Sequence, residues 1–331
     1  MFQGRGPRSA AIGFAFAVFL SIGGNSFAGI STPAIREAVV LVPGTFNSVA
    51  VGGVEWDPVR RVVEMYPYFS EAIVNAVEKQ GYPVYVIRGL APFGKFEQNG
   101  DQVIRQIEEW LKSQPFGKDK VQLTLVGHSA GGFYSLYAAS KNPKLPIRRI
   151  ITLASPMQGM ELADDVFSSG WLGRGLELLC QNLGSGFFNL EGLTGLRTPS
   201  VESFLSQLHL PKDIFVHTIA PSQPIAPSFW EGRNAKYLSI LFSELGKWIG
   251  KDSDGVVSVE SAYGRSAKIL NVEDDEVRIH PMTSLPAPLD HTEQVLDYRV
   301  LRLLGVKETD WVHDQQVELF SRMIDEAKRS E

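Results

Sequence analysis

The sequence contains almost no cysteine, no basic tract and, after residue 28, no long apolar run. The single Cys180 excludes a disulfide within the chain, has no metal-ligand spacing around it, and is expected to be a small buried apolar residue. A formal net charge of −5 without lysine-rich tracts disfavours nucleic-acid binding. The lack of a long apolar run excludes a membrane-spanning helix from the main part of the chain.

The N-terminus differs from the rest. Arginines and no acidic residue precede the apolar segment 11–24, which is short for a membrane span. Small residues follow at Ser26 and Ala28, where an A-x-A-like cleavage rule requires them. These features predict a secretory signal peptide over residues 1–28 and a secreted or periplasmic protein formed by residues 29–331. An uncleaved membrane anchor is the alternative.

Six short apolar runs rich in β-branched residues alternate with amphipathic segments. The runs lack strict alternation of apolar and polar residues, as is typical of strands buried on both faces of a sheet. We expect strands at 38–42, 83–89, 121–126, 148–154, 214–220 and 267–272. Helices are expected at 68–80, ending before Gly81, and at 99–114. This order predicts an α/β fold with a mostly parallel central sheet and helices on both faces.

One segment interrupts the alternation. From about 157 to 210 the sequence is rich in glycine, leucine and aromatic residues and shows no clear strand. We expect a helical, loop-rich insertion between two strands, in effect a cap on the sheet. It can be a second small core, or a mobile lid whose apolar inner face covers a substrate site.

The segment "VGHSAGG" places Ser129 between Gly127 and Gly131, at the junction of the strand predicted at 121–126 and a helix. A sharp turn at such a junction presents a serine hydroxyl for nucleophilic attack and requires small neighbours two residues away on each side. The helix N-terminus that follows favours an oxyanion. The spacing therefore indicates a nucleophile. The alternative is a tight turn with Ser129 as a helix N-cap.

A nucleophilic serine needs a base, which in this architecture follows it in the chain. We favour His291, because it lies in a proline-rich loop leading into a helix that can return the imidazole over the sheet edge. His280, at a possible strand end, is the alternative, and His313 fits the solvated face of a C-terminal helix. His128 is predicted to be a packing residue that points away from the serine hydroxyl.

The acid and the oxyanion donors have candidates as well. Asp254 precedes a glycine and a valine pair, a loop that can hold a carboxylate rigidly against the histidine. Asp252 and Asp290 are the alternatives. The donors are predicted to be the backbone amides of Ala130 and of Thr45, the latter presented by a tight turn at a glycine.

Together these segments resemble the α/β-hydrolases and, more narrowly, the bacterial triacylglycerol lipases that have a lid and, in many members, a calcium site. The resemblance covers most of residues 38–301. It is carried by "VVLVPGTF", "YPYFSEAIVNAVEKQGYPVYVI", "VGHSAGG", "LASPMQGMELAD", "DSDGVVSVESA" and "DHTEQVLD".

The resemblance implies Ser129 as nucleophile, Asp254 as acid and His291 as base, with the Thr45 and Ala130 amides as oxyanion donors. It implies hydrolysis of fatty-acid esters, an exported enzyme, and transient contact of the cap with a lipid surface. A short-chain esterase or polyester depolymerase, an acyltransferase, and an inactive lipid-binding homologue are the alternatives.

The chain departs from the family pattern at two places. The oxyanion loop has Pro43-Gly44 where the family usually has His-Gly. The family's calcium ligands follow the histidine, where this chain has Glu293 and Asp297, both plausible oxygen ligands. The alternative is that both are exposed helix residues. No upstream partner is identified, so no metal is assigned and calcium stays a possibility.

Overall fold

The computed structural model describes residues 36–45, 68–91, 94–115, 121–168, 193–222, 249–285, 288–303 and 309–331. These residues belong to one compact unit over 35–331. The signal peptide predicted at 1–28 and Cys180 lie outside the described residues. Among the helices that are described, none combines the length and apolar character that a membrane crossing requires.

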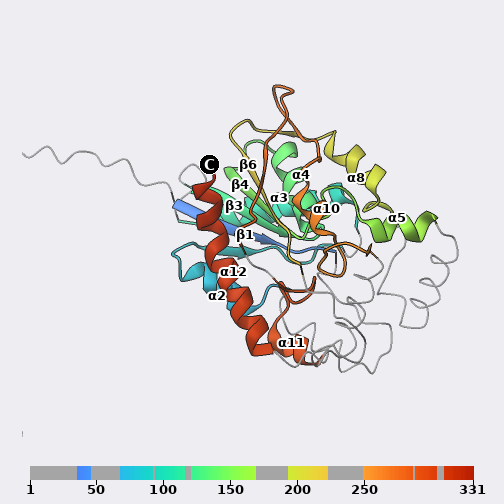
Figure 1. The fold of residues 1–331 in the computed structure, drawn as a ribbon. Helices are drawn as coiled ribbons and strands as arrows, with labels where there is room; N and C mark the ends of the chain where they lie inside the picture. The colour runs from blue at the N-terminus through green and yellow to red at the C-terminus, as the bar shows by residue number, and fades with distance from the viewer. Residues whose placement is uncertain are drawn as a thin grey trace, which may run out of the picture. The chain divides into compact units, whose positions relative to one another are not determined.

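A six-stranded sheet forms the centre of the described structure (Figure 1). Its spatial order is β2 (Val84–Val86), β1 (Arg36–Val42), β3 (Val121–His128), β4 (Ile147–Leu153), β6 (Phe215–Ile219) and β8 (Ile279–Pro281). Each neighbouring pair is parallel. The carboxyl ends of these strands therefore lie at one edge, where loop residues of distant segments meet.

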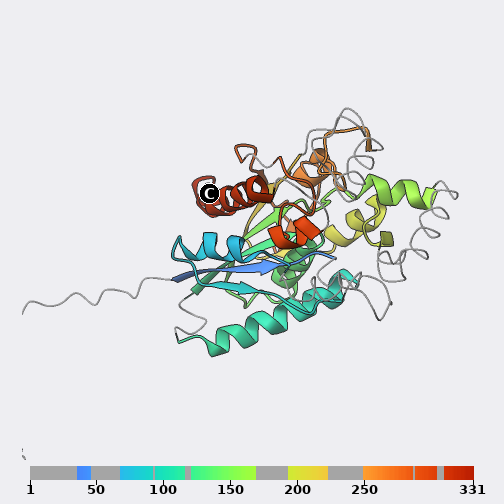
Figure 2. The ribbon, with the colours of Figure 1, turned by 90° about the horizontal axis from the view of Figure 1, so that it is seen from below.

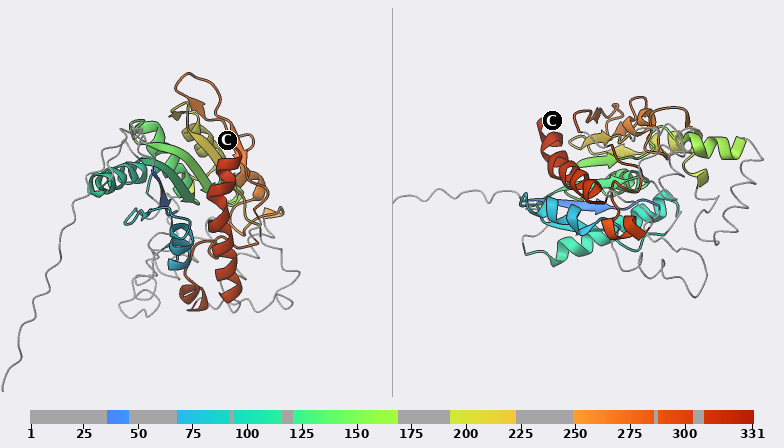
Figure 3. Two further views of the ribbon diagram at one scale, coloured as in Figure 1. Left: turned by 90° about the vertical axis from the view of Figure 1, so that its left-hand side faces the viewer. Right: turned by 60° about the horizontal axis from the view of Figure 1, so that its bottom comes forward.

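Helices cover both faces of this sheet, as the apolar runs predict. On one face lie α3 (Phe96–Ser113) and α4 (Gly131–Lys141), and on the other α2 (Glu71–Glu78) and α12 (Thr309–Arg329). Figure 2 shows α2 and α12 on one side of the strands and α3 on the other, and Figure 3 shows the same separation of α3 from α12. The predicted α/β architecture with a mostly parallel sheet is thus confirmed.

Successive residues of β1 show why the strands read as continuous apolar runs. Val40 joins the core beneath α3 and α4, whereas Val39 and Leu41 join the core beneath α2 and α12. All three side chains are buried. Both faces of the strand therefore require apolar residues, and no polar alternation can appear.

The segment 267–272 does not form a strand of the central sheet, contrary to the prediction. It contains β7 (Leu270–Asn271), which pairs with β5 (His209–Leu210) in a separate two-stranded sheet. The Asn271 side chain accepts hydrogen bonds from two backbone N–H groups of the following residues and closes a turn. The sixth strand of the central sheet is β8 instead.

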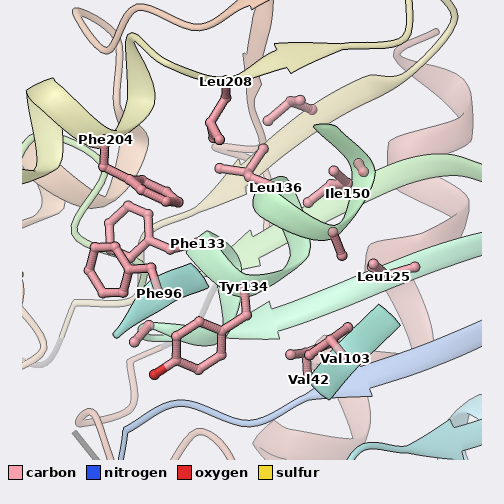
Figure 4. Packing of buried hydrophobic residues seen from close by; sticks show 14 of the residues in the cluster. Val42, Phe96, Val103, Leu125, Phe133, Tyr134, Leu136, Ile150, Phe204 and Leu208 are labelled. Carbon is pink, nitrogen blue, oxygen red and sulfur yellow. The ribbon is translucent and has the colours of Figure 1, made fainter. Parts of the chain in front are cut away.

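Only the two ends of the insertion predicted at 157–210 are described, and residues 169–192 lie outside. The ends hold α5 (Glu161–Ser168) and α8 (Thr198–Leu205), and two short helices occur later, α10 (Val259–Tyr263) and α11 (Tyr298–Leu303). Phe204 of α8 packs edge-on against Phe96, with ring centroids 4.9 Å apart, and lies 5.9 Å from Phe133 (Figure 4). The described ends of the insertion thus belong to the core beneath α3 and α4.

Candidate active site

Ser129 occupies a strained turn between β3 and α4, which we call the serine turn (residues 127–131). Its φ of 54° lies in the left-handed region, which costs a residue with a side chain about 1–3 kcal/mol. Its N–H donates to the Leu153 carbonyl at 2.8 Å, and its own carbonyl accepts from the Ser155 hydroxyl at 2.6 Å. The surrounding strands therefore hold this conformation in place.

Glycines flank the serine because the backbone on each side leaves no room for a side chain. A Cβ at Gly127 would lie 2.4 Å from the Gly131 carbonyl oxygen. A Cβ at Gly131 would lie 2.2 Å from the carbonyl oxygen of Val42, at the end of β1. Both distances are far below any real Cβ contact, so the spacing seen in the sequence has a steric cause.

The loop after β1 (residues 43–45, the β1 loop) lies directly against the serine turn. A Cβ at Gly44 would lie 2.7 Å from the Ser129 Cβ and 2.8 Å from the His128 carbonyl oxygen. Gly44 has no positive φ and precedes a turn at Thr45, so the close approach of the serine turn is what requires a glycine here. Thr45, next in the loop, is buried. Among the described residues, the Ala130 N–H has no hydrogen-bond partner.

Asp254 is fully buried and accepts four hydrogen bonds. Its Oδ1 accepts from the backbone N–H groups of Val256 at 3.0 Å and Val257 at 2.8 Å. Its Oδ2 accepts from His291 Nδ1 at 2.7 Å and from Gln294 Nε2 at 2.9 Å. Four donors compensate the lost hydration of the carboxylate and fix its orientation.

His291 presents one free ring nitrogen. Because Nδ1 donates to the Asp254 carboxylate, the neutral ring carries its lone pair on Nε2. That Nε2 is buried and has no hydrogen-bond partner among the described residues, Ser129 included. The His291 ring centroid lies 4.7 Å from the ring of His128, which precedes Ser129. The structure therefore pairs Asp254 with His291 and brings the imidazole to the serine turn.

The alternative residues lie in other surroundings. His280, on β8, faces His217, with ring centroids 5.3 Å apart. His313 is half-buried on α12, less solvated than predicted. Asp252 is exposed, and Asp290 caps the turn that follows it, where burial raises the pKa of its carboxyl group.

Two residues near the candidate triad were not predicted, and a third has contacts beyond packing. Tyr68 Oη lies 2.7 Å from His128 Nδ1, and Gln294 Oε1 lies 3.1 Å from His128 Nε2. His128 is buried as predicted, and that burial lowers the pKa of its imidazole well below the ordinary value, helped by the nearby His291. Gln294 could have been found from the sequence, because three residues after His291 is one helical turn.

The two possible calcium ligands are bound to protein groups. Asp297 is buried, and its two oxygens accept from Arg299 Nε and from an Arg299 terminal nitrogen, each at 2.9 Å. Glu293 Oε2 accepts from the Asp290 N–H at 3.1 Å. Within the described part of the chain, no three histidine, cysteine, aspartate or glutamate side chains are grouped to hold a metal. These residues do not fit a calcium site.

Comparison with known proteins gives matches only at the level of structure. No family model matches the chain, and no curated protein matches its sequence. The mature lipase BlEst2 of Bacillus licheniformis is 21% identical, with 82% of this chain and 93% of that chain covered at a TM-score of 0.52. The metagenomic carboxyl esterase MGS0156 is 18% identical, with 92% of this chain and 78% of that chain covered at a TM-score of 0.57. The Staphylococcus hyicus lipase is 13% identical, with 91% of this chain and 96% of that chain covered at a TM-score of 0.52. The chain therefore has the α/β-hydrolase fold of these proteins.

Proposed function

We propose that the protein is an exported serine hydrolase that cleaves carboxylic esters of lipids. The observation that carries the proposal is the Asp254–His291 pair, whose imidazole keeps a buried Nε2 without a partner among the described residues and lies 4.7 Å, between ring centroids, from His128, which precedes Ser129. A nucleophile, a base and a group that orients the base are the three requirements of this chemistry.

In this mechanism the Ser129 hydroxyl attacks the acyl carbon of the ester while His291 Nε2 takes its proton. The imidazolium is stabilised by Asp254 and gives the proton to the departing alcohol, which leaves an acyl-enzyme. Water then attacks the acyl carbon while His291 takes a proton from it; His291 gives that proton to the Ser129 oxygen as the acyl–oxygen bond breaks, which releases the carboxylic acid and regenerates the Ser129 hydroxyl. The backbone N–H groups of Ala130 and Thr45 would stabilise the oxyanion in both steps.

Substrate class is inferred from two further features. The solved structures that share the fold are named as lipases and a carboxyl esterase, which supports ester hydrolysis in general. The apolar composition of the insertion at 157–210 supports a cap over the site and longer acyl chains. The N-terminal segment 1–28 supports export.

The test is fluorophosphonate labelling of the purified protein together with hydrolysis of p-nitrophenyl esters of increasing chain length, with and without EDTA. The wild type is expected to label and to prefer longer chains, and Ser129→Ala to lose both labelling and hydrolysis. Ser135→Ala is the matched control, because the Ser135 hydroxyl is also buried and only donates to a helix carbonyl. Normal hydrolysis by Ser129→Ala, or a wild type that neither labels nor hydrolyses, would refute the proposal.

The same assay separates the alternatives. Preference for the shortest esters would indicate an esterase or polyester depolymerase, and acyl exchange with an added alcohol would indicate an acyltransferase. Because both oxygens of Asp297 accept hydrogen bonds from Arg299, we expect EDTA to leave the activity unchanged. Loss of activity in EDTA would contradict this expectation.

A further inference from the structure

A continuous chain of side-chain hydrogen bonds runs behind the candidate triad. It links Tyr68 to His128 at 2.7 Å, His128 to Gln294 at 3.1 Å, and Gln294 to Asp254 at 2.9 Å. Its members come from the segment before α2, the serine turn, the turn of the candidate base and the loop of the candidate acid. His128, Gln294 and Asp254 are all buried, with exposed fractions of 1% or less.

Elementary chemistry fixes the direction of each bond in this chain. The ionised Asp254 carboxylate only accepts, so the Gln294 amide nitrogen donates to it and the amide oxygen faces His128. That oxygen only accepts, so His128 carries its proton on Nε2. The Nδ1 atom of a neutral His128 is then an acceptor, and the Tyr68 hydroxyl donates to it.

Tyr68, at the far end of this chain of hydrogen bonds, contacts the β1 loop. The Tyr68 oxygen keeps its lone pairs after donating to His128, and the Gly44 backbone acts against the rise in the Tyr68 pKa that burial causes. The same oxygen lies 3.1 Å from the position of a Cβ on Gly44, so the two groups are in contact.

We propose that His128 and Gln294 are positioning residues for the Asp254–His291 pair. This proposal rests on the proposed function. Gln294 shares Oδ2 of Asp254 with His291 and so sets both the orientation of the carboxylate and the charge that the imidazole experiences. His128, held by Tyr68, orients Gln294. One relay thus contacts both the candidate acid and the β1 loop and aligns them without touching substrate.

The relay depends on a neutral donor at position 294. A leucine there removes the donor to Asp254 and the side-chain acceptor of His128 Nε2. A glutamate matches the amide only when protonated, because its O–H can then donate to Asp254 while its C=O accepts from His128. Once ionised, it places a second buried negative charge beside Asp254. The other titratable groups around this point are His128, His291, Tyr68 and Asp290, which interacts electrostatically with Asp254.

The experiment compares Gln294→Leu and Gln294→Glu in the pH dependence of kcat and KM for one soluble ester. Gln294→Leu is expected to lower kcat by about ten- to a hundredfold, the scale of loss when a group that orients a metal-bound histidine is removed, with little change in KM. Gln294→Glu is expected to approach wild-type kcat at the acidic end of the profile and to lose activity as pH rises. Equal loss at every pH in both variants, or no loss in Gln294→Leu, would overturn the proposal.

Gln316→Leu is the matched control. Gln316 is also a buried glutamine, bonded to the carbonyls of Glu293 and Leu296, but it does not contact the triad. It is expected to lower stability and to leave the shape of the pH profile unchanged.

A spectroscopic readout separates this proposal from the proposed function. The NMR resonance of the proton between His291 and Asp254 is expected to move in Gln294→Leu and to stay in Gln316→Leu. If that resonance moves while the wild type hydrolyses no ester, the function is wrong and the relay stands. If the wild type is active and the resonance does not move, the relay is wrong.

Discussion

His291 Nδ1 lies 2.7 Å from Asp254 Oδ2, although 37 residues separate the two along the chain. A second bond joins the same residues, because the backbone N–H of His291 donates to the Asp254 carbonyl at 3.0 Å. The imidazole is thus held by both its side chain and its backbone. Its orientation is fixed before any substrate binds, which is the preorganisation that proton transfer requires.

Asp254→Asn is expected to lower kcat by about 10⁴-fold, the cost when the carboxylate of a triad becomes an amide and the histidine loses its correct tautomer. The amide also cannot accept all four hydrogen bonds that Asp254 now receives. Initial rates of p-nitrophenyl ester hydrolysis check the prediction. Asp290→Asn is the control, because its remaining oxygen can still cap the turn, and its activity is expected to stay within about threefold of wild type.

Gly44→Ala is expected to lower kcat by about a hundredfold or more, because the new methyl group would lie against the Ser129 Cβ and displace the β1 loop, which carries the amide that we propose as an oxyanion donor. Steady-state kinetics checks this, with melting temperature measured alongside. The comparison variant is Gly81→Ala, at a φ of 90° with no atom within 4 Å of the new Cβ. It should lower the melting temperature and leave kcat unchanged. A fully active Gly44→Ala would show that the loop does not contribute.

His217 is expected to make the protein less stable in mild acid. Burial, with the positive charge of Arg149 and the neighbouring His280, lowers its pKa from 6.5 to about 4. Above pH 6.5 the ring is neutral in both the folded and unfolded states. As pH falls from 6.5 towards 4, the unfolded chain binds the proton and the folded protein does not, so the free energy of unfolding decreases by up to about 3 kcal/mol.

Urea unfolding at a series of pH values checks this effect. His217→Gln cannot titrate and should lose less stability between neutral and mildly acidic pH than the wild type. His209→Gln is the control, because the His209 side chain is 46% exposed and lies in the small sheet. If His217→Gln and the wild type lose stability in parallel, the buried ring is not the cause. The Glu331 carboxylate, 3.9 Å from His217 Nε2, is the group that could reduce the effect.

The central sheet could be predicted because burial on both faces leaves a local signal. Five of its strands coincide with apolar runs such as 121–126 and 148–154. The sixth, β8, has the sequence Ile-His-Pro, whereas the equally short and half-buried β2 is Val-Tyr-Val, so only β2 has the composition of a strand. The run at 267–272 has the composition of a strand, but a turn closed by Asn271 ends it after two residues.

The candidate site could be predicted only in part, because its partners are not local. Small residues around Ser129 and the sequence order of acid and histidine are visible in the sequence. Tyr68 and His128 are 60 residues apart in the sequence, and His128 and Gln294 are 166 apart. No local sequence pattern predicts contacts over such separations. The binding of Asp297 to Arg299 is local, yet family resemblance favours reading the same carboxylate as a metal ligand.

Ser129 lies in the first half of the chain, whereas Asp254 and His291 lie in the last third, so the parts of the candidate site need not form at the same time during folding. Strands β1 to β4 could pair and present Ser129 while the segments carrying Asp254 and His291 were still unstructured. Such an intermediate would present the Ser129 hydroxyl without its proposed base, and the hydroxyl would not react with the fluorophosphonate probe. Recovery of probe labelling after dilution from urea would therefore time the last step of assembly, whereas circular dichroism would time the first.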